Sequence, residues 1–224
     1  MSRHADAGEG RLAWLRTTGR ASAAGSRPEA AVPGAGPPAA CRGLVPGTGP
    51  GAPVGNVEHV EEDAVIIERQ LGRSPRGFVG VAWRCPLGRP GVVLTAPQLP
   101  DGSPFPTTYY LTCPVAVRLC STAESTGAMA EFERRLAGEP GLAAAYQWAH
   151  GEYRVDREHL AAALGLDDPV PPSVSAGGMP DRVKCLHALV AHALAAGPGV
   201  NPVGDEVLSA WGPAWAAGCE GGDS

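Results

Sequence analysis

The sequence has no apolar run long enough to cross a membrane and no excess of basic residues. No stretch of its 224 residues approaches the roughly 20 apolar residues that a membrane-spanning helix needs. The first residues also lack the apolar core of an export signal, so we expect a soluble, cytoplasmic protein. A net charge of -5 argues against a general nucleic-acid or anionic-membrane binder, because both functions need a basic surface.

The sequence also lacks the regular cysteine spacing of a secreted, disulfide-stabilised domain. Its six cysteines are widely and irregularly spaced, and in a reducing cytosol they are expected to be thiols, metal ligands or redox groups. No serine lies in a nucleophile-elbow pattern, and no pair of carboxylates stands out. The sequence therefore leaves open whether the chain is an enzyme.

Composition divides the chain into a tail and one domain. Residues 1–57 are rich in Ala, Gly, Pro and Ser and show no helical or strand periodicity. Such a segment cannot bury enough apolar area to offset the entropy lost on ordering. We predict a disordered tail over residues 1–57, a single α+β domain over residues 58–218 and a disordered C-terminus over residues 219–224.

The expected domain is a small three-stranded sheet followed by a mostly helical C-terminal half. Short β-branched and aromatic segments predict the strands, and turn residues separate them. A helix over residues 61–71, ended by Gly72, precedes the sheet. We expect strands at 77–83, 92–96 and 107–112, then helices at 114–127, 128–137, from 140 with a break near Gly151, 158–164, 181–196 and 205–211.

Several longer motifs carry a family resemblance. The segments are Gln70-Leu-Gly-Arg-Ser-Pro-Arg-Gly77, Arg84-Cys-Pro86, residues 99–107, residues 109–114, residues 175–187 and residues 197–202. In this order they resemble the actinobacterial domain-of-unknown-function family 501, over roughly residues 65–208. The family has no established activity. The resemblance implies a bacterial cytoplasmic protein, and members are often encoded near cell-division and polyphosphate-metabolism genes. The sequence departs from some relatives at Leu87, where they carry a second cysteine.

Two cysteines are expected at one edge of the sheet. If the strands form an up-down-up meander, Cys85 and Cys113 leave the same end of strands one and three. A proline follows each of them and fixes the chain direction just after the sulfur. Cys113 would also precede a helix N-terminus, where the backbone dipole favours thiolate.

Cys185 and His187 complete a candidate metal set with these two cysteines. Residues two apart on a helix point about 200° apart, so both can bind one ion only if the first turn of the helix is irregular. Candidate cofactors for Cys85, Cys113, Cys185 and His187 are zinc or an iron–sulfur cluster. The alternatives are cysteines that pack as small apolar side chains, or a redox or nucleophilic thiol.

A glycine-rich loop provides a candidate anion site. Gly177 and Gly178 can expose backbone N–H groups just before the helix expected from residue 181. Arg182 and Lys184 in its first turn oppose the helix dipole unless an anion binds there. The alternative is an Asp181 N-cap with two solvated basic side chains.

These patterns support two functions. The first is a protein that binds a metal or a small anionic ligand through the Cys/His set and the glycine-rich loop. The alternative is a non-catalytic structural or protein-interaction module, for which the resemblance suggests a link to cell division. The sequence does not name a protein partner.

Overall fold

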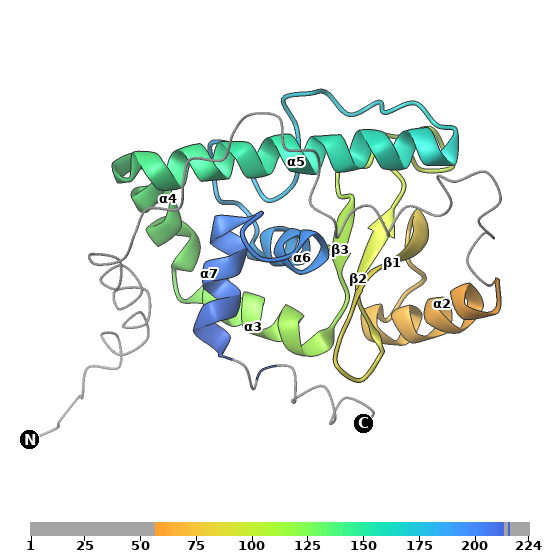
Figure 1. Ribbon diagram of the computed structural model, residues 1–224. Helices are drawn as coiled ribbons and strands as arrows, with labels where there is room; N and C mark the ends of the chain where they lie inside the picture. The colour runs from red at the N-terminus through yellow and green to blue at the C-terminus, as the bar shows by residue number, and fades with distance from the viewer. Residues whose placement is uncertain (1–56, 213–214, 216–224) are drawn as a thin grey trace, which may run out of the picture.

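A three-stranded antiparallel sheet lies beside a group of helices in the computed structural model, which describes residues 57–212 and 215 (Figure 1). The strands are β1 (Phe78–Arg84), β2 (Pro90–Thr95) and β3 (Tyr109–Leu111), and they lie side by side in the order β1-β2-β3. The α+β class is confirmed, and the strands form the antiparallel meander that was assumed for the two cysteines. Most of the expected tail, residues 1–56, and the expected C-terminal segment, residues 219–224, lie outside the described residues.

The two faces of the sheet differ in what covers them. Side chains alternate along a strand, so Val92 and Leu94 of β2 face one side with Tyr109 and Leu111 of β3, and all four belong to the main hydrophobic core. Val93 and Thr95 point to the other side, where α2 (Val57–Leu71) lies. Helix α2 ends at Leu71, directly before the predicted stop at Gly72, whose φ is 67°.

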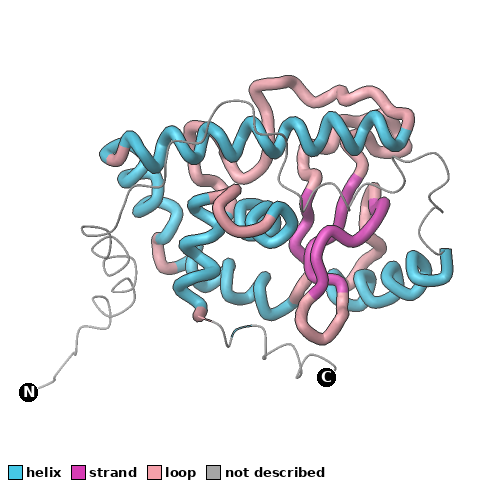
Figure 2. The backbone as a smooth tube through the Cα atoms, in the orientation of Figure 1, coloured by secondary structure: helices cyan, strands magenta, loops and turns pink. Residues whose placement is uncertain are grey.

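The helical half surrounds one central helix. It consists of α3 (Pro114–Ser125), α4 (Ala128–Gly138), α5 (Pro140–Leu164), α6 (Leu186–Ala196) and α7 (Pro202–Trp211). Figures 1 and 2 show α6 between the sheet and α7, with α3 on one side and α5 on the other. Helix α6 contacts β3, α7 and α3, and most of its residues are buried. Because the core is built around it, the first turn of α6 is held firmly in place.

Helix α5 runs unbroken for 25 residues, so the predicted interruption near Gly151 is wrong. A glycine inside a helix costs only about 1 kcal/mol relative to alanine. Buried residues recur on one face at spacings of three or four, including Tyr146, Ala149, Tyr153 and Leu160. Packing along this face outweighs the local preference of one glycine.

Helix α6 begins at Leu186, five residues later than the sequence predicts. The backbone N–H of Arg182 donates to the carbonyl of Gly178 at 2.9 Å, and that of Lys184 donates to the carbonyl of Gly177 at 2.7 Å. These bonds hold residues 181–184 in a turn rather than a helix. Cys185 is extended, with φ -157° and ψ 111°, and is the N-cap residue of α6.

Helix α7 also begins earlier than predicted, at Pro202. Its cap is the Asn201 side chain, which accepts a hydrogen bond from the Gly204 N–H at 3.0 Å. Among the described residues, no helix has both the length and the apolar character needed to cross a membrane.

Candidate metal site at the start of helix α6

The loop before α6 sets the position of Cys185. Gly177 and Gly178 both have positive φ, at 69° and 94°. A Cβ atom on Gly177 would lie 2.6 Å from the side chain of Leu189, and one on Gly178 would lie 2.6 Å from the carbonyl oxygen of Arg182. Only glycine fits such close approaches. The two glycines therefore let the chain turn back tightly. As a result, Cys185 lies in an extended conformation directly before the helix.

Three possible metal ligands converge at this point. Cys185 and His187 come from the start of α6, and Glu124 comes from the last turn of α3. One ligand atom from each lies within 4.8 Å of the other two. The Cys185 Sγ is 3.8 Å from the His187 Nδ1, and this nitrogen is 3.1 Å from the Glu124 Oε1. We call Glu124, Cys185 and His187 the Glu-Cys-His cluster.

Groups outside the cluster fix the orientation of its side chains. The other ring nitrogen of His187, Nε2, lies 3.2 Å from the carbonyl oxygen of Val117 and 3.3 Å from the Ser121 hydroxyl. Because a carbonyl only accepts, this geometry favours a proton on Nε2. The Glu124 Oε1 also accepts a hydrogen bond from the Leu186 N–H at 2.7 Å, which ties α3 to the start of α6.

The charges of the cluster act mainly on His187. Its contact with Cys185 and the nearby Glu124 carboxylate raise the pKa of the imidazole to about 9, although partial burial opposes this shift. Cys120 lies close by but is fully buried, and burial raises the pKa of its thiol. Cys120 is therefore a neutral packing residue, whereas His187 is a cation when no metal is bound.

The predicted metal set is brought together only in part. Cys185 and His187 lie close together because Cys185 is extended and α6 begins only after it. The sequence analysis required such an irregular first turn for both to bind one ion. Cys85 and Cys113 follow β1 and β3 at one end of the sheet, and both are buried. Within the described part of the chain, neither belongs to a group of three or more ligands. Glu124 was missed, since no spacing in the sequence links it to residues some sixty positions away.

The predicted anion site does not lie at a helix N-terminus, because α6 begins only at Leu186. The Arg182 Nε donates to the Glu133 Oε1 at 2.8 Å, and the side chain of Lys184 is exposed. The carbonyls of Gly177 and Gly178 accept hydrogen bonds from within the loop. Anion binding therefore stays a prediction for Gly177, Gly178, Arg182 and Lys184. One of the two cations, Arg182, is already paired with the Glu133 carboxylate.

A comparison with protein families supports the resemblance found in the sequence. The model of a family described as "Protein of unknown function (DUF501)" matches residues 81–209, which is more than half of the chain. The match spans β2, β3 and helices α3 to α6 completely, and it includes the Glu-Cys-His cluster. No curated protein and no solved structure matches the chain.

Proposed function

We propose that this chain, which belongs to the DUF501 family, binds a zinc-type divalent metal ion through Glu124, Cys185 and His187. The convergence of a thiol, an imidazole and a carboxylate on one centre is the observation that carries the proposal. These are the three side-chain types that bind zinc in proteins. An iron–sulfur cluster is less suitable, because it is normally held by several cysteines and this group has one.

Two of the three spacings between ligand atoms are close to those of a tetrahedral ion, and the third, from the Cys185 sulfur to a Glu124 oxygen, is within 4.8 Å. With zinc–ligand bonds of about 2.0–2.3 Å, neighbouring ligands of a tetrahedron lie roughly 3.3–3.8 Å apart. The distances from the His187 Nδ1 are 3.8 Å to sulfur and 3.1 Å to oxygen. An ion could therefore enter with only small side-chain rotations.

The second nitrogen of His187 is arranged as in metal sites. A ligating histidine usually donates its other ring N–H to a carbonyl or carboxylate, which fixes the tautomer. Here Nε2 faces the Val117 carbonyl at 3.2 Å, so Nδ1 is the nitrogen that faces Cys185 and Glu124. A metal would replace the proton on Nδ1, so binding should release a proton near neutral pH.

Three protein ligands leave a fourth position open. The side chains of His187 and Glu124 are 27% and 22% exposed, so solvent reaches the cluster. Zinc sites with three protein ligands and a water are typical of catalysis, whereas structural sites have four protein ligands. Such a water would be the group that a substrate or an exogenous ligand displaces.

A reactive thiol at Cys185 is the second candidate function. Cys185 is the N-cap of α6, where the helix dipole favours an anion, and its sulfur lies 3.8 Å from the His187 ring. A neighbouring imidazole is the usual partner of a nucleophilic cysteine. Metal binding and thiol reactivity use the same sulfur, so one experiment can separate them.

Zinc titration of the full chain tests the proposal. The protein is stripped with a chelator and titrated against a competing zinc indicator. We expect one equivalent to bind the wild type, and Cys185→Ala or His187→Ala to weaken binding by at least about 100-fold, because each removes a direct ligand. Cys85→Ala and Cys113→Ala are the matched controls and should still bind. Equal loss in these controls would instead support the set expected from the sequence.

Alkylation by iodoacetamide separates the two candidates. If zinc occupies the cluster, added zinc should slow the modification of Cys185, followed by mass spectrometry of its peptide. Fast modification that zinc leaves unchanged, together with no zinc bound in the titration, would favour the reactive thiol. Slow modification and no zinc binding would leave the cluster as a structural contact between α3 and α6, as the alternative of a non-catalytic module requires.

A further inference from the structure

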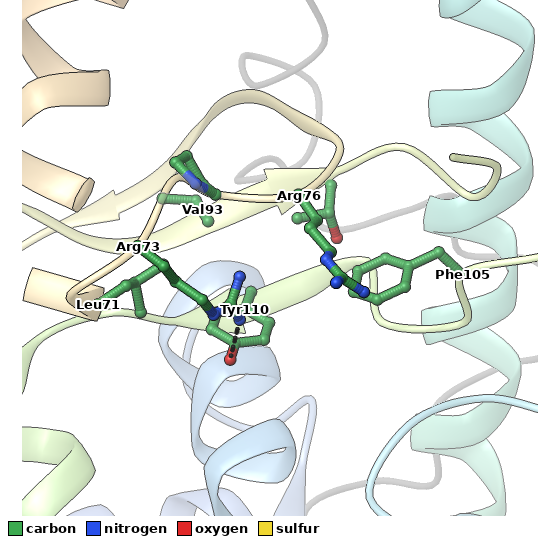
Figure 3. A pocket seen from close by; sticks show the side chains of 8 residues that line it. Leu71, Arg73, Arg76, Val93, Phe105 and Tyr110 are labelled. Carbon is green, nitrogen blue, oxygen red and sulfur yellow. Dashed lines mark hydrogen bonds between the residues drawn. The ribbon is translucent and has the colours of Figure 1, made fainter. Parts of the chain in front are cut away.

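A second feature lies on the opposite side of the sheet from α6. A pocket opens between the end of α2, the loop that leads into β1, and the outer face of β2 and β3 (Figure 3). Side chains alternate along a strand, so Val93, Thr95 and Tyr110 face this pocket while their neighbours face the core. The lining residues are Leu71, Arg73, Pro75, Arg76, Val93, Thr95, Phe105 and Tyr110.

Neither arginine of the pocket forms a salt bridge with a carboxylate among the described residues, although Asp101 interacts with Arg76 at longer range. Figure 3 shows Arg73 extending from the loop toward Tyr110, and Arg76 toward Phe105. Elsewhere in the described chain an arginine usually pairs with an acid: Arg84, Arg134, Arg135, Arg154, Arg157 and Arg182 each form a salt bridge. Arg73 and Arg76 therefore place two positive charges without a salt bridge at one hollow, and the exposed Asp101 carboxylate offsets part of the charge of Arg76.

Tyr110 holds one arginine in place and adds a donor. The Arg73 Nη2 donates to the Tyr110 hydroxyl at 3.2 Å, and the guanidinium carbon lies 6.0 Å from the centre of the ring. The hydroxyl oxygen acts as acceptor in this bond, so its own proton remains available to an incoming acceptor. Two guanidinium groups and one hydroxyl thus offer donors around the pocket mouth.

The remainder of the lining is largely apolar. Leu71, Val93 and Phe105 present hydrocarbon surface beside the donors. The hollow contains about 240 Å³ of empty space, including the part open to solvent. Most of this space is open, and its enclosed part holds about one water molecule. A bound charged group would therefore lie at the mouth of the hollow, beside the two arginines.

From these observations we propose that the pocket binds the phosphoryl dianion of a small phosphate ester. Arginine guanidinium groups bind phosphate oxygens with paired, charge-assisted hydrogen bonds. Two guanidinium groups that form no salt bridge match a dianion better than the single charge of a carboxylate. The overall charge of -5 does not favour a nucleic-acid backbone as the source of the phosphate. This site is independent of the Glu-Cys-His cluster and does not require a metal.

Calorimetric titration of the full chain tests the pocket, with inorganic phosphate and phenyl phosphate as probes at constant ionic strength. Both should bind, and phenyl phosphate should bind more tightly, because its ring can cover the apolar lining. Acetate should bind at least about tenfold more weakly, since it carries one charge. Tyr110→Phe removes one donor and should raise the Kd of phosphate severalfold.

Two double variants locate the site. Arg73→Gln with Arg76→Gln should raise the Kd of phosphate by at least about tenfold, because both charged donors are lost. Arg118→Gln with Arg134→Gln removes two charges from α3 and α4, outside the pocket lining, and should leave phosphate binding unchanged. All four side chains are exposed, so both variants should fold as the wild type does. Binding that survives the first variant, is lost in the second, or is absent from the wild type would overturn the proposal, as would acetate binding as tight as phosphate.

Discussion

The first and second turns of helix α6 each carry a histidine, and the two have opposite surroundings. His187 is partly exposed, and both of its ring nitrogens face polar groups. His192 is fully buried between the rings of Tyr109 and Tyr153, and its Nε2 has no hydrogen-bond partner. Its Nδ1 lies 3.2 Å from the Asn201 amide nitrogen.

The contrast shows how tertiary surroundings assign different chemistry to the same residue type on one helix. The Cys185 contact and the Glu124 carboxylate raise the pKa of His187 to about 9. Burial alone lowers the pKa of His192 to about 3. The first turn can therefore exchange protons and ligands, whereas the second is a neutral part of the core. Three substitutions test this difference between the two turns of α6.

The largest effect is expected where the buried part of α6 packs on α7. A Cβ atom on Gly204 would clash with the Leu189 carbonyl oxygen and would lie 2.7 Å from the Ala193 Cβ. The clash involves backbone that cannot move alone, so Gly204→Ala should lower the free energy of unfolding by about 3 kcal/mol. Denaturant unfolding measures the loss. Gly141→Ala, in an open position on α5, is the control and should be neutral or slightly stabilising.

An intermediate effect is expected on acidification, from His192. Its pKa is about 3 in the folded state and about 6.5 when unfolded, so between these values the unfolded chain binds a proton that the folded chain excludes. Stability should therefore fall as the pH drops below 6.5, by about 2 kcal/mol at pH 5 from this residue.

His192→Gln, which does not titrate, should remove this part of the acid dependence. The comparison uses the change in unfolding free energy between pH 6.5 and 5 within each protein, so any constant loss from the substitution cancels. Identical pH slopes in both proteins would show that His192 takes up a proton in the folded state and that the contrast between the two turns does not hold.

The smallest effect is expected at alkaline pH, from His187 in protein kept free of metal with a chelator. Its folded pKa of about 9 lies above the unfolded value, so its contribution is complete below pH 6.5 and disappears as the pH rises through 9. Because the side chain is partly exposed, we expect only about 1 kcal/mol. His187→Gln should flatten the alkaline slope between pH 7 and 9.5. An unchanged slope would mean that Cys185 and Glu124 do not hold the proton on His187.

Local signals in the sequence predicted most of the fold. Alternating β-branched and aromatic residues located the three strands, and Pro114 and Pro140 marked the starts of α3 and α5 as expected. Errors occurred where packing overrode local preference. Gly151 does not interrupt α5, because a buried face on both sides of it holds the helix together. Residues 181–185 are not helical, because hydrogen bonds to Gly177 and Gly178 keep them in a turn.

The candidate site was predicted only where its residues are close in the sequence. Cys185 and His187 were identified as a pair that requires an irregular turn, and α6 begins between them. Glu124 could not be found in this way, because only the packing of α3 on α6 brings it to His187. Arg73 and Arg76 lie in one of the motifs that carry the family resemblance, but their position beside one hollow is recognised only in three dimensions.

The sequence by itself determined the α+β layout, the approximate positions of the strands and the family, because these depend on residue patterns, turn residues and motifs that are read along the chain. The tertiary structure decided which side chains meet: Glu124 with His187, Arg73 with Tyr110, and Asn201 with His192. The physical reason is that charge, protonation and ligand geometry depend on neighbours within a few ångströms. Those neighbours come from helices and strands distant in the sequence, and their positions are fixed only when the core packs.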